Sequence, residues 1–421
     1  MSILLHLTRL FLFLLPFQVA LSPVSGIDLP LSRVFAPLLF LFWLARGLSR
    51  KKVSIPLVSE SAFLFVFLFL SFISIVWAED VSWAGRRMLF LLSFYPLFLV
   101  YTTICAETPF AVRTVFRAVV AGAALAACVG LVQFFSQFFL GVSFVFRFWM
   151  REIVPVFLGS SFGASVAEYP SLLVNVGGTT ILRASSFFPD PHVAAFFFGI
   201  AFPFSFALAV MAVTRREKVT FLIFSILILL ADLLSFSRGG YVGLMFGVIF
   251  AGFRYVKINR LFVHRGAILL GLSLIGTLSI TPIRDRLVSS FVLEEGSNAG
   301  RIGMYTMAIR KIAERPFGYG LANYPLAVKT NAGYREPIYA HDLYLDIATE
   351  TGIAGAAVFL AAIVSAFWKL ARSTDPMRSA AAVSLVIFFG HSLFETPLYS
   401  VHVLPMLLLL LALASPPKPD S

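Results

Sequence analysis

Long apolar runs dominate this chain and restrict what it can fold into. About twelve stretches of roughly 20 mainly apolar residues follow one another, and each is long enough to cross a bilayer as a helix. The predicted spans lie near residues 3–21, 29–47, 60–77, 87–105, 115–140, 192–213, 219–235, 238–253, 266–281, 351–370, 379–394 and 398–414. In water, a fold of this chain would leave large apolar surfaces exposed, so a membrane fold is predicted.

The composition agrees with that expectation, because 59% of the residues are hydrophobic, 13% are charged and 47 are phenylalanine. We therefore predict an all-α, polytopic integral membrane protein whose residues 1–421 form a single transmembrane domain. Only two cysteines occur, Cys105 and Cys128, both inside or beside apolar segments. A structural disulfide is not indicated.

The basic residues predict the orientation in the membrane. Lysine and arginine collect in short cytoplasmic loops, and here they follow the even-numbered spans. These residues are Arg46, Arg50, Lys51 and Lys52; Arg113 and Arg117; Arg215, Arg216 and Lys218; Arg254, Lys257, Arg260 and Arg265; and Lys369, Arg372 and Arg378. Both termini are thus expected in the cytoplasm. The net charge of +12 follows from this topology, and no nucleic-acid partner is expected. Segment 3–21 resembles a signal peptide, but Arg9 interrupts it, so an uncleaved first span is expected.

Two long connections, 141–191 and 282–345, follow odd-numbered spans and are predicted on the outer, periplasm-like side. The first ends in Arg183-Ala184-Ser185-Ser186-Phe187-Phe188-Pro189-Asp190-Pro191-His192. Pro189 and Pro191 break helix, so a rigid turn at the membrane entry is one interpretation of this stretch. Arg183 and Asp190 are also candidates for substrate binding or for support of the site.

A short turn between two predicted spans reads Ser235-Phe236-Ser237-Arg238-Gly239-Gly240-Tyr241. Arg238, flanked by small residues at the top of two apolar helices, can meet a lipid-linked phosphate at close range. The alternative is an interfacial arginine that extends its side chain toward the headgroups.

The second long connection contains an amphipathic pattern between residues 300 and 315. Ile302, Tyr305, Ile309 and Ile312 recur at helical spacing, with Arg310, Lys311, Glu314 and Arg315 on the other side. The pattern predicts a helix on the membrane surface that ends at Pro316 and the Gly318-Tyr319-Gly320 turn. Arg301 stands at the start of this helix, close to the membrane plane, and is a candidate phosphate ligand.

His341 follows this basic connection and precedes an apolar helix. An imidazole can act as a general base near neutral pH, although a lone interfacial histidine is more often structural. Glu395, just beyond span 379–394, could orient an arginine or bind acceptor sugar, or it could be an ordinary interfacial carboxylate. Tyr339 could stack on sugars or belong to an interfacial aromatic belt.

Several of these motifs occur together, and in this order, in one known family. They are Phe188-Pro189-Asp190-Pro191-His192, Ser237-Arg238-Gly239-Gly240, Gly300-Arg301, Pro316-Phe317-Gly318-Tyr319-Gly320, and His341 followed eleven residues later by Gly352. Over roughly residues 180–400 the chain resembles the O-antigen ligase and polymerase superfamily and looks most like a ligase. His192 stands where that family often has asparagine.

The resemblance implies a glycosyltransferase in the bacterial inner membrane with its active site facing the periplasm. Such an enzyme takes a glycan from undecaprenyl diphosphate and moves it to the lipid A core (ligase) or to another lipid-linked repeat (polymerase). It also implies that Arg238 and Arg301 bind the diphosphate and that His341 is the base.

A metal-independent, inverting reaction fits the sequence, and no cofactor is expected. The chain has no Asp-x-Asp pair, no glycine-rich phosphate loop with lysine, and no His/Cys cluster at zinc spacing. A transporter or channel is a different possibility, but charged residues are scarce within the predicted spans, where transporters place their sites. A non-catalytic assembly protein would predict that the arginines and His341 are individually replaceable.

Overall fold

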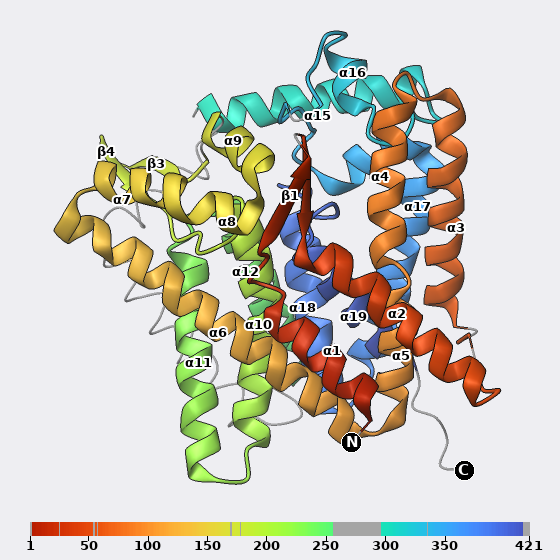
Figure 1. Ribbon diagram of the computed structural model, residues 1–421, viewed down its shortest axis with the longest axis vertical. Helices are drawn as coiled ribbons and strands as arrows, with labels where there is room; N and C mark the ends of the chain where they lie inside the picture. The colour runs from red at the N-terminus through yellow and green to blue at the C-terminus, as the bar shows by residue number, and fades with distance from the viewer. Residues whose placement is uncertain are drawn as a thin grey trace.

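The computed structural model of the protein describes residues 2–24, 26–53, 55–56, 58–168, 171–176, 178–255, 296–334 and 336–415. The described chain is mostly helical and forms a bundle of long helices (Figure 1). The predicted helical membrane protein is thereby supported. The expectation of an all-α chain misses two short antiparallel hairpins, β1–β2 (Ala20–Val24, Ile27–Pro30) and β3–β4 (Leu173–Val176, Thr179–Leu182).

The longer helices are α1 (Ile3–Leu14), α2 (Leu31–Ser49), α3 (Ser59–Ile73), α4 (Val81–Phe94), α5 (Leu97–Glu107), α6 (Pro109–Leu140), α10 (Pro191–Met211), α11 (Arg215–Leu233), α12 (Arg238–Tyr255), α15 (Gly296–Glu314), α17 (Leu343–Ala371), α18 (Pro376–Ser392) and α19 (Val403–Leu413). The shorter ones are α7 (Val142–Phe148), α8 (Val154–Leu158), α9 (Ser160–Glu168) and α16 (Tyr324–Val328). A 3₁₀ turn, Ser74–Trp77, extends α3.

Within the described ranges, 6 helical stretches are long and apolar enough to cross a membrane. They are Leu31–Ser49, Ser59–Trp77, Val81–Glu107, Pro109–Leu140, Pro191–Met211 and Leu343–Ala371. The total of twelve spans stays a prediction, and the span expected at 266–281 lies outside the described residues. The helix predicted to begin at 351 begins earlier, at Leu343, because Asp342 caps it by accepting from two backbone N–H groups.

The close packing of α12 on α18 depends on glycines spaced one turn apart. A Cβ on Gly239 would lie 2.5 Å from the His391 ring, and one on Gly243 would lie 2.6 Å from the Ile387 carbonyl oxygen. Without side chains, these positions let the two helix backbones approach closely. The contact fixes Arg238, the first residue of α12, beside the end of α18.

Both predicted outer connections contain regular structure. Residues 141–191 include α7, a π-helical turn (Trp149–Ile153), α8, α9 and the β3–β4 hairpin. In the connection 282–345, residues 282–295 lie outside the described ranges, and the rest holds α15 and α16. In Figure 1, α15 runs across one end of the upright helices. That both connections face the periplasm stays a prediction.

The helix predicted from the 300–315 pattern is present as α15. Ala308 is buried and Tyr305 is partly buried, whereas Ile302 and Ile309 are 50% and 57% exposed. Arg301 and Tyr305 make polar contacts with the segment after α18. That the exposed apolar side of α15 lies on the membrane surface stays a prediction.

A break in α17 explains why glycines recur in the sequence motifs. Gly352 has φ +82°, and a Cβ there would lie 2.8 Å from the Phe317 carbonyl carbon. The turn after α15 bonds to the groups freed by the break: Ile353 N–H donates to Pro316 (3.0 Å), and the Gly320 N–H donates to the Glu350 carbonyl (2.9 Å). The motif therefore fastens the end of α15 to α17.

Candidate functional site

Glu395 lies just after α18, where three other elements meet. Its Oε1 accepts a hydrogen bond from Arg301 Nη2 at 2.6 Å, and its Oε2 lies 3.1 Å from His341 Nδ1. His192 Nε2 approaches Oε1 at 3.5 Å. Arg301 comes from α15, His341 from the segment before α17, and His192 from the first turn of α10. We call these four residues the Glu395 cluster.

The Glu395 carboxyl is buried, with its side chain 7% exposed. Burial raises its pKa, but His192, the hydrogen bond and charge of His341, and the charge of Arg301 lower it more strongly. The pKa of Glu395 therefore lies well below its ordinary value, and the group is an anion at neutral pH. A buried anion of this kind orders the cations and imidazoles around it.

This electrostatic arrangement predicts how acid affects stability. Because the pKa of Glu395 is lower in the folded state than in the unfolded state, its charge stabilises the fold above pH 4.5, the ordinary glutamate value. That contribution is lost as the pH falls below 4.5 and through the folded-state pKa. Glu395→Gln should lower the free energy of unfolding near neutral pH by roughly 3–5 kcal/mol, because Arg301 stays buried without its anion. Thermal unfolding in detergent between pH 3 and 7 measures both effects; equal acid sensitivity in the two proteins would contradict the assignment.

His341 is held in a fixed orientation. Its backbone has φ 57°, in the left-handed region, and its ring lies against Tyr339 with centroids 4.2 Å apart. Since the Glu395 carboxylate can only accept, the contact at 3.1 Å places a proton on His341 Nδ1. The other ring nitrogen, Nε2, then presents a lone pair that can take a proton.

Asp346 ties together the two chain segments that carry His341 and Glu395. Its Oδ1 accepts from the Ala340 N–H at 2.7 Å, and its Oδ2 accepts from the Thr396 hydroxyl. Ala340 precedes His341 and Thr396 follows Glu395. One buried carboxylate on α17 thus sets the spacing of the two functional side chains.

With His341 as the base, the role that the family resemblance implies, Asp346→Ala should lower turnover by roughly 10- to 100-fold, because a displacement of about 1 Å of a reacting group can have an effect of that size. Donor affinity should change little. Asp346→Asn should recover much of the activity, since an amide can still accept from Ala340 and contact Thr396. Steady-state kcat and KM for both variants test this, with Asp375→Ala, a cap at the start of α18, as control. A donor KM that rises in step with the fall in kcat would argue for a different role.

Arg301 and Tyr305 attach α15 to the Glu395 cluster. Tyr305 donates from its hydroxyl to the Leu393 carbonyl at 2.9 Å. Burial raises the pKa of Tyr305 to about 12, so the hydroxyl stays protonated and remains a donor. The Arg301 side chain is 15% exposed, and its Nη2 donates to Glu395. The remaining N–H groups of the guanidinium can donate to an anion.

Arg238 lies next to a network of buried polar groups. Its neighbour Ser237 contacts His192 Nδ1 at 3.0 Å and His391 Nε2 at 3.2 Å through Oγ. Because His192 also reaches Glu395, this network joins the start of α12 to the Glu395 cluster. The Arg238 side chain is buried, at 6% exposed.

Arg183 supports the α11–α12 turn. Its guanidinium donates to the carbonyls of Ser235 at 2.6 Å, Phe236 at 3.1 Å and Ser171 at 3.1 Å. Of the two roles considered for it, substrate binding and support, these contacts favour support. Arg183 holds the turn that presents Ser237 and Arg238.

Asp190 caps α10, and its Oδ1 accepts from the backbone N–H groups of His192 and Val193 at 2.8 Å each. Burial raises the pKa of Asp190 to about 6, although those hydrogen bonds oppose the shift. The contacts favour the interpretation of this stretch as a rigid entry turn. Asp190 acts on the cluster by fixing the position of His192.

The sequence motifs named most of the residues that meet here: Arg301, His341, Glu395 and Tyr339. They did not single out Asp346 or Ser237 for a role in the site. His192 was noticed only as a departure from the family pattern, and its contact with Glu395 puts that departure inside the cluster.

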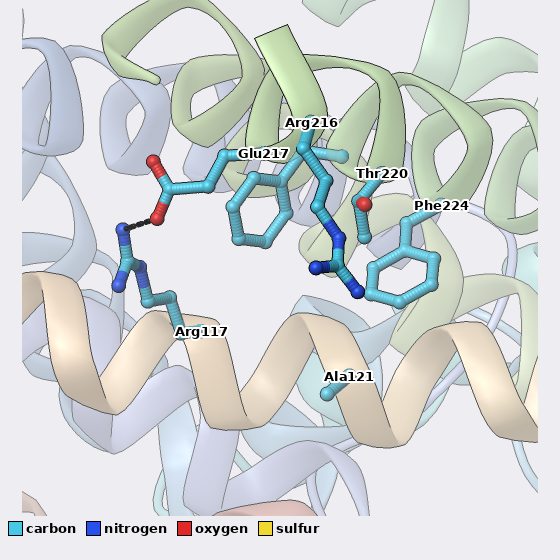
Figure 2. Close-up of a pocket in the computed structure, with 7 residues that line it drawn as sticks. Arg117, Ala121, Arg216, Glu217, Thr220 and Phe224 are labelled. Carbon is cyan, nitrogen blue, oxygen red and sulfur yellow. Dashed lines mark hydrogen bonds and ion pairs between the residues drawn. The ribbon is translucent and has the colours of Figure 1, made fainter. Parts of the chain in front are cut away.

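A groove between α6 and α11 lies at the other end of α11 from this cluster. Arg117 of α6 pairs with Glu217 of α11 at 2.9 Å, as Figure 2 shows, and Arg216 points from α11 toward α6 beside Phe224. This end of the helices is predicted to be cytoplasmic from these same basic residues. None of the residues that line the groove belongs to the Glu395 cluster.

The described residues contain no group of three or more His, Cys, Asp or Glu side chains arranged to hold a metal ion. The Glu395 carboxyl group contacts arginine and imidazole, and the nearby Asp346 carboxyl group accepts from a hydroxyl and a backbone N–H.

The long apolar helices define a multi-pass helical membrane protein. Residues 223–360, about a third of the chain, match the model of the O-antigen ligase family. The resemblance to the O-antigen ligase superfamily predicted from the motifs is therefore confirmed. The matched segment contains Arg238, Arg301 and His341, whereas His192 and Glu395 lie outside it. No curated protein matches the chain.

Proposed function

We propose that the protein is a glycosyltransferase of the bacterial inner membrane that takes a glycan from undecaprenyl diphosphate on the periplasmic face. The acceptor we favour is the lipid A core, as in O-antigen ligation during lipopolysaccharide biosynthesis. The observation that carries the proposal is the Glu395 cluster, in which one buried carboxylate orients both an imidazole and an arginine at the same point. The family match supports the reaction class.

His341 is the proposed base. Glu395 fixes the Nδ1 proton, so Nε2 can remove the proton from an acceptor hydroxyl. The acceptor oxygen then bonds to the sugar C1 from the face opposite the diphosphate. The C1–O bond to the diphosphate breaks, its electron pair leaves with undecaprenyl diphosphate, and the anomeric centre is inverted. The proton on Nε2 is afterwards released to water.

Arg301 and Arg238 are the proposed ligands of the diphosphate. The leaving diphosphate develops negative charge as the C1–O bond breaks, and fixed guanidinium groups stabilise that charge without having to reorganise. Arg301 is restrained by Glu395 and by the attachment of α15 through Tyr305. This restraint gives the cation a fixed position relative to His341.

Complementation of a ligase-deficient Gram-negative strain tests the proposal. The wild-type chain should restore the lipopolysaccharide ladder on a gel and lower the pool of undecaprenyl-linked glycan at matched membrane expression. Elongated glycan that stays on undecaprenyl diphosphate, with no ladder on lipid A core, would instead identify a polymerase. A ladder restored equally by His341→Ala and Arg301→Ala would show that the proposed active site is wrong.

A further inference from the structure

A second group of arginines lies on α2 and α4, outside the site described above. Arg33 is placed over the Phe90 ring at 5.6 Å, Arg86 over Tyr334 at 5.1 Å, and Arg87 over Tyr399 at 3.7 Å. The rings of Phe90 and Tyr399 are themselves 6.5 Å apart, and Arg86 is next to Arg87 in α4. The three cations, which we call the α2–α4 arginines, therefore belong to one aromatic-lined cluster. The helices that carry them pack on each other.

The α2–α4 arginines carry more positive charge than their surroundings balance. Within the described residues none of the three has a carboxylate in ion-pair range. Arg87 feels the charge of Glu350, which also accepts from the Tyr399 hydroxyl at 3.1 Å. The Nε of Arg33 is buried and has no hydrogen-bond partner in that part of the chain. A buried donor without an acceptor is costly, and an anionic ligand would satisfy it.

The cluster borders the surface that would face lipid. Arg86 is exposed on α4, and Leu89, on the same side of the helix, is 63% exposed. On α2, Val34 and Leu38 are 38% and 57% exposed. An acyl chain can lie along these apolar side chains while its charged group meets the arginines, as at other membrane interfaces. The surroundings thus fit a phosphate that is attached to a lipid.

The α2–α4 arginines also adjoin the Glu395 cluster. Tyr399 follows Glu395 by one short turn of chain, and Glu350 lies one helical turn beyond Asp346 on α17. Arg301 is anchored on Glu395, whereas Arg33, Arg86 and Arg87 lie over the rings of Phe90, Tyr334 and Tyr399. The two sets of arginines thus have different partners, and we assign them to separate phosphates.

On the basis of the proposed function, we propose that Arg33, Arg86 and Arg87 form a second phosphate-binding subsite. This subsite binds a phosphate group carried by the lipid acceptor. Donor and acceptor then each present a phosphate to a different set of arginines, with His341 at the sugar between them. Separate subsites let both lipid-linked substrates bind together without placing two phosphates on one cation.

Binding is measured on the purified full-length chain in detergent micelles by quenching of tryptophan fluorescence. The probe is phosphatidic acid with brominated acyl chains, and brominated diacylglycerol serves as the neutral comparison. Trp83 packs on Tyr334 with ring centroids 5.2 Å apart, so a lipid bound at the cluster brings bromine near it. The triple variant R33Q/R86Q/R87Q should need about tenfold more phosphatidic acid for half-maximal quenching. Quenching by diacylglycerol should not change.

Two further proteins sharpen this test. R117Q/R216Q, which removes arginines at the predicted cytoplasmic end of α6 and α11, should bind the phosphatidic acid probe like wild type. If the triple variant does not fold, R86Q alone, at an exposed position, should shift the curve in the same direction by less. Equal quenching by both lipids, or wild-type binding by a folded triple variant, overturns the subsite. Displacement of the probe by millimolar inorganic phosphate would assign the site to free phosphate and overturn the lipid assignment.

Kinetics then connect the subsite to the reaction. In a transfer assay the triple variant should raise the acceptor KM about tenfold and leave the donor KM unchanged. The quenching measurement needs no turnover, so it can be made even if the wild-type chain transfers no glycan. Failure of the proposed function can therefore be distinguished from failure of the subsite.

Discussion

Replacing His341 with alanine is expected to lower glycan transfer by roughly 10²- to 10⁴-fold, the usual contribution of general acid–base catalysis. The physical reason is that Glu395 orients the ring so that Nε2 can accept the acceptor proton, and alanine offers no acceptor there. Donor binding should be retained, because Arg301 and Arg238 are unchanged. The measurement is single-turnover transfer from an undecaprenyl-diphosphate-linked glycan with enzyme in excess.

His6→Ala is the matched control, since His6 is exposed near the start of α1 and belongs to no cluster. It should transfer glycan at the wild-type rate. His192→Asn provides a second comparison, because His192 also reaches Glu395 but has its Nε2 directed at the carboxylate. If His192→Asn lowers the transfer rate as much as His341→Ala does, His192 is the base instead of His341.

Replacing Arg301 with alanine is expected to lower the rate of transfer by roughly 10²- to 10³-fold, as removal of one preorganised donor to a developing negative charge does. Arg301→Lys should recover only part of this, because an ammonium cannot contact two phosphate oxygens in the planar geometry of a guanidinium. Donor KM and the rate of the chemical step are both measured. Most of the loss should fall on the chemical step if the charge develops as the C1–O bond breaks.

Arg310→Ala is the control for Arg301. Arg310 is on the same helix, is exposed, and pairs only at the surface with Glu314. Such surface pairs contribute little to stability, so the variant should transfer glycan normally. Since loss of Arg301 leaves Glu395 with fewer partners, thermal unfolding of each variant is compared as well. Full activity of a stably folded Arg301→Ala protein would contradict its assignment to the diphosphate.

The sequence singled out individual residues of the Glu395 cluster but not their mutual contacts. His341 and Glu395 stand beside apolar segments, and Arg301 stands near the start of an amphipathic helix. The roles of these three residues stay predictions. The contact between His192 and Glu395 depends on how α10 packs against the end of α18, and no local pattern encodes that packing. Asp346 was equally hidden, because it stands inside a helix and acts through backbone groups.

One feature of the fold was mispredicted. Residues 20–21 and 29–30 were assigned to the ends of two helical spans, with 22–28 as their connection, because apolar composition does not distinguish a strand from a helix end. The β1–β2 hairpin depends instead on the turn at Gly26. In α15 the apolar pattern predicted the helix but not its polar contacts. Arg301 and Tyr305 contact Glu395 and the Leu393 carbonyl, and these contacts depend on how α15 packs against the segment after α18.

The most direct test of the central claim is a reconstituted reaction with both products quantified. Purified wild-type protein in proteoliposomes receives an undecaprenyl-diphosphate-linked glycan and lipid A core, and free undecaprenyl diphosphate and glycosylated acceptor are measured together. We expect one undecaprenyl diphosphate for each glycan transferred, an inverted anomeric centre, and loss of both products in His341→Ala. Transfer by the His341→Ala protein at the wild-type rate, or an acceptor product with the donor's anomeric configuration, would contradict the proposed mechanism.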